Sequence, residues 1–324
     1  MELPTLAEIE AAAKDIIYPT MPPTPQYPWP LLAERCGCEV VVKHENHTPT
    51  GAFKVRGGLV YLHQLKATGE TRGVVSATRG NHGQSLAFAG RRTGTPVVIV
   101  VPEHNNPEKN AAMAAFGAEV VVHGQDFDAA RKILGTLAAQ RNLHEVPSFH
   151  PWLICGVASY WLELFRAHPD LDAVYVPIGM GSGIVSALRV RDLLGHTTEI
   201  IGVVAEKAPA FAHSVAEGRV VTTATADTFA DGMACREPHP DAVEIVRRGA
   251  ARVVTVGEEA IAQAIVHLYR DTHNLAEGAG AAGLAALLQE RQIHAGRKVG
   301  LTLCGGNIDL ATFIERCGRT ALHE

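Results

Sequence analysis

The chain has few of the features that mark secreted, membrane or nucleic-acid-binding proteins. Its six cysteines are too few for a disulfide scaffold in 324 residues, which favours a reducing cytoplasm. The apolar run Val97–Val101 covers five residues, far short of the ~20 that cross a membrane. The acidic N-terminus, Met1–Glu10, has no signal-peptide core. Lys and Arg number 29 against 34 Asp and Glu, so no nucleic-acid or anionic-membrane partner is expected.

What the chain does contain is a globular composition with 47% hydrophobic and 19% charged residues. At roughly 100–200 residues per domain, its length favours two domains. Short β-branched runs bounded by glycine or proline predict strands that are buried on both faces. These runs are Glu39–Lys43, Gly73–Ser76, Pro96–Val101, Ala118–His123, Asp172–Val176, Glu199–Ala205, Ala251–Val256 and Lys298–Leu303.

Amphipathic segments between these runs predict helices. They are Gly83–Arg92, Pro107–Phe116, Phe127–Ala139, Gly181–Leu194, Glu258–Asp271 and Ala279–Arg291. Repeated alternation of strand and helix predicts an α/β fold with parallel sheets covered by helices. The proline-rich stretch Tyr18–Pro30 is interpreted as an extended arm. Since ligands of such sheets bind beyond the carboxyl ends of strands, the loops after strands are the places to search.

Two polar, glycine-containing loops stand out in the first half of the chain. In Asn46–Gly58, Lys54 is surrounded by glycines and apolar residues, and desolvation there can turn a lysine into an amine nucleophile. The alternative is a surface lysine at the start of a helix. In Ser76–Gln84, amides at a helix start suit a carboxylate or phosphate, whereas an ordinary helix cap by Thr78 or Asn81 is the alternative.

Two more loops stand out in the second half. In Pro177–Ser186, three glycines at alternate positions can direct several amides at one anion. A dinucleotide fingerprint needs a third glycine where Ile184 stands, although Glu206 lies near the spacing of a ribose-binding acid, so a nicotinamide cofactor stays an alternative. In Leu303–Asn307, Cys304 lies at the mouth of a sheet, or in a plain tight turn.

Together the four loops resemble the fold type II pyridoxal-phosphate enzymes, in the threonine/serine dehydratase and serine racemase branch. The lysine motif of that family, Ser/Thr-Gly-Ser-Phe-Lys-x-Arg-Gly, matches Thr50-Gly-Ala-Phe-Lys-Val-Arg-Gly57. The family's Ser-x-Gly-Asn-His-x-Gln loop matches Thr78-Arg-Gly-Asn-His-Gly-Gln84. Smaller agreements are Asp231–Ala234 and Glu277–Gly280, and the likeness runs from about residue 15 to about residue 315.

The resemblance implies two open, twisted, mainly parallel sheets with helices on both faces, similar to the tryptophan synthase β chain. It implies pyridoxal 5′-phosphate as cofactor, with Lys54 as the Schiff-base lysine and base at the substrate Cα. The other cofactor-binding residues that it implies are Phe53, Asn81, Gly179, Met180, Gly181, Ser182, Gly183 and Cys304. The substrate-binding residues that it implies are Thr78, Arg79, Asn81, His82 and Gln84.

With the boundary at His144–Trp152, the expected domains are a large one, 1–70 and 152–324, and a small one, 71–151. A homodimer is expected, and no regulatory domain is expected, because the sequence stops soon after the catalytic body. No metal is predicted, because Glu206 matches one acid of the branch's metal site and Ala208–Ala212 offers no second.

The expected function is a lyase that converts a β-hydroxy-α-amino acid, such as threonine or serine, to a 2-oxo acid and ammonia. Arg79 replaces a racemase serine and is a poor proton shuttle, which disfavours racemisation. If its side chain enters the site, an extended substrate such as 3-hydroxyaspartate is expected to gain a charged contact. The alternatives are a racemase, a β-replacement enzyme, a nicotinamide oxidoreductase and a catalytically silent amino-acid-binding protein.

Overall fold

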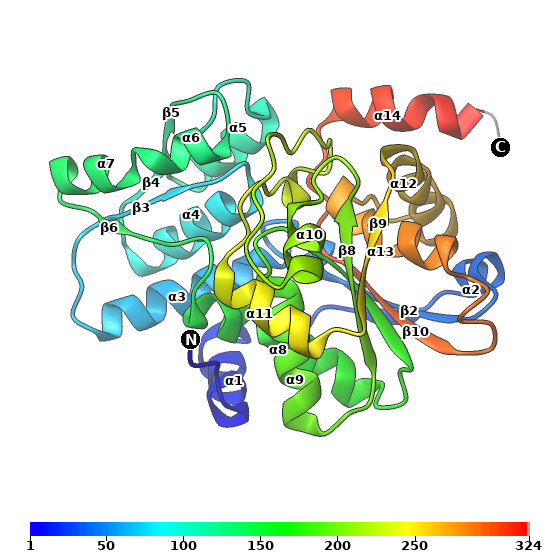
Figure 1. Cartoon of the computed structure of the whole chain (residues 1–324). Helices are drawn as coiled ribbons and strands as arrows, with labels where there is room; N and C mark the ends of the chain where they lie inside the picture. The colour runs from blue at the N-terminus through cyan, green and yellow to red at the C-terminus, as the bar shows by residue number, and fades with distance from the viewer. Residues whose placement is uncertain (323–324) are drawn as a thin grey trace.

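The computed structural model describes residues 1–322 and contains two sheets (Figure 1). The larger sheet has the strand order β1-β2-β10-β7-β8-β9, and all neighbours are parallel except the β1–β2 pair. Its strands are β1 (Gln26–Pro28), β2 (Glu39–His44), β7 (Ala173–Pro177), β8 (Glu199–Ala205), β9 (Arg252–Val256) and β10 (Lys298–Leu303). The predicted α/β class with two mainly parallel sheets is confirmed.

The smaller sheet is parallel throughout and has the order β5-β4-β3-β6. Its strands are β3 (Val74–Ala77), β4 (Val97–Val101), β5 (Glu119–Val122) and β6 (His144–Glu145). It lies on the left of Figure 1 with helices α4 to α7, and the larger sheet lies on the right. The smaller sheet comes from one continuous stretch of the chain, whereas the larger sheet combines β1 and β2, which precede that stretch, with β7 to β10, which follow it. The division into two domains at residues 71 and 151 stays a prediction.

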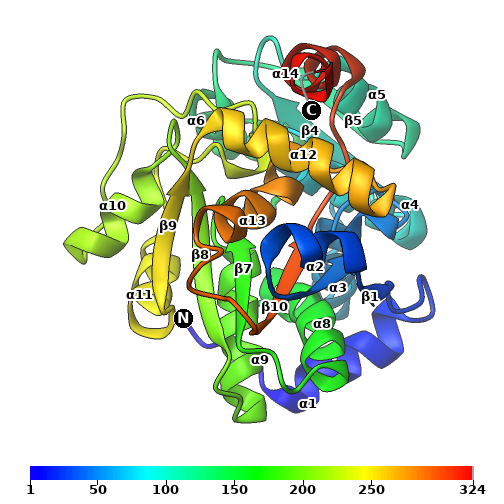
Figure 2. The same cartoon turned by 90° about the vertical axis from the view of Figure 1, so that its right-hand side faces the viewer.

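Helices surround both sheets (Figures 1 and 2). In the first half of the chain they are α1 (Leu6–Ala12), the π-helical turn η1 (Ala13–Ile17), α2 (Pro30–Cys36), η2 (Glu45–His47), α3 (Lys54–Ala67), α4 (Asn81–Thr93), α5 (Pro107–Ala115), α6 (Phe127–Lys132) and α7 (Leu134–Arg141). In the second half they are α8 (Pro151–Ala167), α9 (Ser182–Leu194), α10 (Ala210–Glu217), η3 (Asp231–Met233), α11 (Pro240–Gly249), α12 (Glu258–Thr272), α13 (Gly278–Gln289) and α14 (Leu310–Leu322).

The strands of the larger sheet bury side chains on both faces. Val41 belongs to a core with α8, α9 and α11, whereas its neighbours Val40 and Val42 belong to a second core with α12 and α13. Successive strand side chains point to opposite faces, so a continuous valine run serves both cores. This is why the apolar runs predicted the strands closely.

Several elements differ from the sequence prediction. The predicted helix 127–139 is split at Ile133 into α6 and α7. The predicted extended arm contains β1 and leads into α2, which begins at Pro30. Helix α8 was not predicted, because it packs between α3 and α9 and is buried almost all round, so it shows no polar stripe. Among the described residues, no helix is long and apolar enough to cross a bilayer.

Candidate active site

A pocket lies where loops from both sheets meet, and it brings together nearly all of the predicted site residues. The smaller sheet contributes the loop after β3, and the larger sheet contributes the loops after β7 and β10. The predicted residues that line it are Phe53, Lys54, Thr78, Arg79, Asn81, His82, Gly179, Met180, Gly181, Ser182, Gly183 and Cys304. Gln84 does not line it, because it lies one turn further along α4 with its side chain buried.

Lys54 occupies the first position of α3, and its amine is enclosed. Its Nζ donates a hydrogen bond to Ser182 Oγ at 2.9 Å and lies 5.0 Å from the centre of the Phe53 ring. The Phe53 amide in turn donates to the Cys304 carbonyl at 2.9 Å, which ties this turn to the end of β10. Burial lowers the pKa of Lys54 to about 8. A large fraction of this amine is therefore neutral, and nucleophilic, near pH 8.

The glycine loop after β7 leads into α9 in a conformation that needs glycine. Gly181 has φ of +99° and caps α9, a region that residues with a side chain rarely adopt. A Cβ at Gly179 would come within 2.2 Å of the Gly232 carbonyl oxygen. The loop is thus compact, and the free amides of the first turn of α9 can receive an anion such as a phosphate.

The loop after β3 leads into α4 and offers a second helix N-terminus. Thr78 Oγ1 accepts a hydrogen bond from the Gly80 amide at 2.9 Å, which shapes the loop. Burial, with Lys54 nearby, lowers the pKa of His82 to about 3, so its ring is neutral. In the described part of the chain His82 Nε2 has no hydrogen-bond partner, although it is buried. A buried polar atom without a partner is costly, and a bound ligand is the natural partner here.

Cys304 follows β10 and is buried at the base of the pocket. Burial raises the pKa of its thiol well above the ordinary value, with a smaller contribution from Glu277. The thiol is therefore neutral at any physiological pH. If the implied cofactor binds with its ring nitrogen beside Cys304, this neutral, weak donor would not stabilise a proton on that nitrogen.

Charged residues that the sequence analysis did not assign also line the pocket. Lys109 on α5 lies 3.1 Å from Asp231 and 3.4 Å from Glu277, measured from its Nζ to the carboxylate oxygens. Arg79 Nη2 lies 3.0 Å from the other oxygen of Asp231. Asp231 and Glu277 lie in the two smaller agreements with the family, but Lys109 carried no sequence signal. Only the packing of α5 beside α4 brings it to the site.

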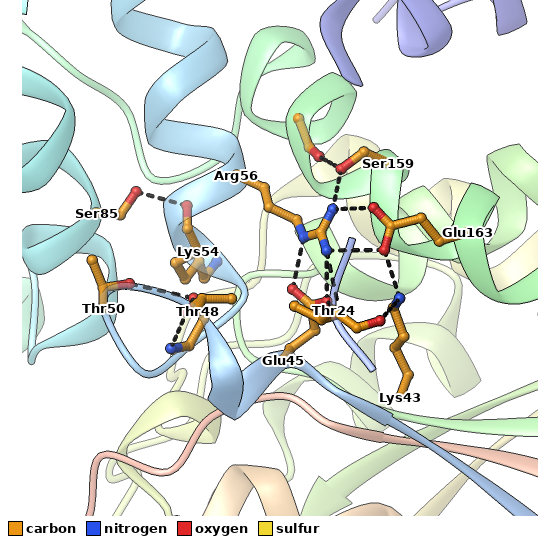
Figure 3. Close-up of polar contacts among 12 residues, drawn as sticks. Thr24, Lys43, Glu45, Thr48, Thr50, Lys54, Arg56, Ser85, Ser159 and Glu163 are labelled. Atoms are coloured by element: carbon orange, nitrogen blue, oxygen red, sulfur yellow. Dashed lines mark hydrogen bonds and ion pairs between the residues drawn. The ribbon is translucent and has the colours of Figure 1, made fainter. Parts of the chain in front are cut away.

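Behind Lys54 lies a buried cluster of charges, drawn in Figure 3. Arg56, fully buried, donates to Glu45 on one side and to Glu163 on the other. Lys43 donates to the same Glu163 carboxylate. This quartet joins β2, η2, α3 and α8, and it fixes the helical turn that begins with Lys54.

Comparison with known proteins identifies the family. A family model described as pyridoxal-phosphate-dependent enzyme matches residues 17–305. The chain belongs to the pyridoxal-phosphate-dependent enzymes. It is 37% identical over 284 residues to the L-threonine ammonia-lyase of Geobacter sulfurreducens. This alignment covers 87% of this chain and 70% of that protein.

Solved structures of this enzyme family are also close. Maize serine racemase matches with a TM-score of 0.89 at 25% identity, covering 99% of both chains. A pyridoxal 5′-phosphate-dependent aspartate racemase matches with a TM-score of 0.88 at 28% identity, covering 97% of this chain and 98% of that one. The predicted resemblance and cofactor are therefore confirmed, and a nicotinamide cofactor finds no support.

The residues of the pocket fit pyridoxal phosphate. A buried lysine with a lowered pKa, a glycine-lined helix N-terminus and a neutral thiol supply an amine, an anion site and a ring-nitrogen partner. Within residues 1–322 no group of three or more His, Cys, Asp or Glu side chains is arranged to hold a metal ion, and Glu206 is exposed at the end of β8.

Proposed function

We propose that the enzyme is an ammonia-lyase that acts on a β-hydroxy-α-amino acid such as threonine or serine. The β-hydroxyl leaves with the Cα proton as water, and hydrolysis of the resulting imine gives a 2-oxo acid and ammonia, so that no net water is consumed. The observation that carries this proposal is the Lys54 amine, which lies between two helix N-termini, α4 and α9. The likeness to L-threonine ammonia-lyase supports it.

Some residues of the pocket would bind the cofactor and others the substrate. When bound, pyridoxal phosphate supplies an electron-withdrawing ring that makes the substrate Cα proton acidic. Lys54 would hold it covalently, residues 179–183 would bind its phosphate, Asn81 would contact its ring oxygen, and Cys304 would face its ring nitrogen. Phe53 packs beside the Lys54 amine at the floor of this site.

Lys54 would then act as a base. With substrate bound, its free amine would take the proton from Cα, because a pKa near 8 lets it both accept and return a proton at neutral pH. The amides at the start of α4 would hold the substrate carboxylate, with Thr78 shaping the loop and His82 offering an unpartnered ring nitrogen. Gln84 remains a predicted second contact.

The state of Arg79 favours small substrates. Its guanidinium lines the pocket but is already paired with Asp231 at 3.0 Å. A distal carboxylate on the substrate would have to compete with Asp231 for it, so we place serine and threonine ahead of 3-hydroxyaspartate. One observation keeps the extended substrate as a second candidate. Arg79 Nε is buried, and the described residues offer it no acceptor, so a charge-assisted contact of about 1.5–3 kcal/mol is open to a substrate.

Racemisation needs a second proton-transfer group opposite Lys54. Arg79 stands where the resemblance places a racemase serine, and a guanidinium does not deprotonate at accessible pH. We therefore propose that elimination exceeds racemisation, even though serine and aspartate racemases share the fold. We further propose a cytoplasmic homodimer with the domain division given above. Sedimentation analysis of the purified enzyme tests the dimer.

The deciding experiment is an assay of 2-oxo acid and ammonia release from threonine, serine and 3-hydroxyaspartate. The wild-type enzyme and Arg79→Ser are compared on all three. We expect turnover of serine and threonine by both enzymes, and at most an order of magnitude of change in kcat/KM on threonine. A loss confined to 3-hydroxyaspartate would support the extended substrate, whereas equal effects on all three would remove the selectivity argument. Absence of 2-oxo acid from every substrate would contradict the lyase proposal.

A further inference from the structure

Asn81 is held at both ends of its amide by residues outside its own helix. Its Nδ2 donates to Glu277 Oε1 at 2.5 Å, and its Oδ1 accepts from Asn307 Nδ2 at 2.8 Å. The same Asn307 Nδ2 donates to the Thr50 carbonyl at 2.8 Å. These contacts define which end of the Asn81 amide is oxygen and which is nitrogen. Asn81 also lines the pocket.

Glu277 therefore fixes the nitrogen end of the Asn81 amide, provided that its carboxylate accepts a hydrogen bond. An ionised carboxylate only accepts, and it suits the Asn81 nitrogen. A protonated carboxyl can donate through its hydroxyl, and it then suits the Asn81 oxygen equally well. If the amide turned over, its nitrogen would face the Asn307 nitrogen, and two donors would oppose each other. Protonation of Glu277 thus removes one of the two contacts that fix the Asn81 amide and leaves only the Asn307 contact to hold it.

The surroundings of Glu277 make its charge depend on one cation. It occupies the N-cap position of α13 and is 4% exposed. Burial raises its pKa above the ordinary value, and Lys109 and the Asn81 hydrogen bond offset only part of this effect, while Asp231 adds to it. Cys304, another titratable group in electrostatic contact with Glu277, carries a neutral thiol. Lys109 is the cation that faces this carboxylate, at 3.4 Å.

The side chain of Lys109, on α5 beside the smaller sheet, is held by packing against the loop before α4. Its stem passes over Gly80, where an added Cβ would lie 2.5 Å from Lys109 Cδ. Gly80 precedes α4, so the backbone before Asn81 and the Lys109 side chain are packed together. Burial alone would lower the pKa of Lys109, but Glu277 and Asp231 together raise it, and the ammonium is retained.

We propose that Lys109 is a positioning residue that keeps Glu277 ionised and thereby fixes the Asn81 amide for the cofactor. The proposal goes beyond the lyase function and rests on it only in taking Asn81 as a cofactor contact. Lys109 itself need not touch the cofactor or the substrate. Its effect is transmitted through one carboxylate and one amide.

The test uses Lys109→Met, which keeps the stem and removes the charge, with Lys109→Arg as the conservative control. Thermal unfolding of the cofactor-free chain is followed at pH 5 and pH 8. An acid whose folded pKa is raised loses stability as pH rises from its unfolded pKa, near 4.5, through its folded pKa. Lys109→Met raises that folded pKa further. We expect its melting temperature to fall more at pH 8 than at pH 5, and Lys109→Arg to restore most of the loss.

A second background isolates Glu277 from Asp231, which also loses a contact with Lys109 but keeps Arg79. Glu277→Gln retains an acceptor for Asn81 and has no proton to gain. Lys109→Met in this background is expected to lose the pH dependence. Affinity for pyridoxal phosphate at pH 8 is expected to fall about tenfold in Lys109→Met alone, the size of one hydrogen bond.

An equal loss of stability at both pH values would assign Lys109 a purely packing role and overturn the proposal. A pH dependence that persists in the Glu277→Gln background would overturn it too, because the titrating group would then not be Glu277. Normal cofactor affinity in Lys109→Met at pH 8 would have the same consequence. All of these readouts are independent of turnover. If the enzyme proved inactive on β-hydroxy amino acids, the proposed lyase function would fail while this result stood.

Discussion

Replacing Glu163 by glutamine is expected to destabilise the protein severely, since it unbalances the buried charge cluster behind Lys54. Arg56 and Lys43 are fully buried and face Glu45 and Glu163, so two cations meet two anions. Arg56 reaches Glu163 at 2.7 Å and 3.1 Å, and Lys43 reaches it at 2.5 Å. Glutamine keeps the shape and an acceptor oxygen but removes one negative charge.

The size of the effect follows from burial. Burial by itself raises the pKa of Glu163, but Arg56 and Lys43 together hold it below its usual value. Burial also lowers the pKa of Lys43 in spite of Glu163. Without the carboxylate, Lys43 must stay charged in an apolar surrounding or release its proton. Breaking a buried pair by removing one partner costs about 3–5 kcal/mol, and we expect Glu163→Gln to fall in this range.

Urea unfolding at pH 7, followed by circular dichroism, measures the loss. The double variant Lys43→Met with Glu163→Gln restores the charge balance around Arg56, so it should be more stable than the sum of the single effects by at least about 1 kcal/mol. Glu119→Gln serves as a matched control, because its partner Arg141 lies 2.6 Å away on the surface, and an exposed pair is worth about 0–1 kcal/mol. A cost for Glu163→Gln as small as that of the control would refute the reasoning.

Two further predictions concern the pocket itself. Cys304→Ser keeps a neutral donor at the base of the pocket and should retain cofactor and turnover within an order of magnitude; loss of activity with cofactor still bound would show that the thiol has a specific role. Lys54→Met should stabilise the cofactor-free chain, most strongly below pH 8. This gain in stability should shrink from about pH 8 towards pH 10.5, because over that window Lys54 is protonated in the unfolded chain but not in the folded one. Thermal unfolding measures it, and a gain in melting temperature that does not vary with pH would contradict the lowered pKa of Lys54.

The sequence predicted the strands and the loops of the site for one physical reason. Strands buried on both faces must be apolar throughout, and the carboxyl ends of parallel strands meet at one edge. Loops that are far apart in the chain, such as those at Thr78, Gly181 and Cys304, therefore line one pocket. Lys54 stood out because a lysine among glycines and apolar residues is unusual, but its predicted role came from the motif Thr50–Gly57 that resembles the family's lysine motif.

Other features depended on packing that no local pattern reveals. Helix α8 lacks a polar face because neighbours cover it on several sides. Helix α3 contains Gly58, where a Cβ would lie 2.1 Å from Ser85 Oγ, so its glycines permit close contact with α4. Lys109 looked like any helical lysine. The direction of Arg79 and its pairing with Asp231 also required the fold.

The central claim, that Lys54 carries the cofactor, is tested most directly by reducing the cofactor-loaded enzyme with borohydride and mapping the labelled peptide by mass spectrometry. Among the residues that the structure describes, two lysines line the pocket, and they differ in the state of their amines. Burial lowers the pKa of Lys54 to about 8, whereas Glu277 and Asp231 outweigh burial and keep Lys109 an ammonium. We predict the pyridoxyl group on Lys54 alone. A label on Lys109, or on any other lysine, would contradict the account.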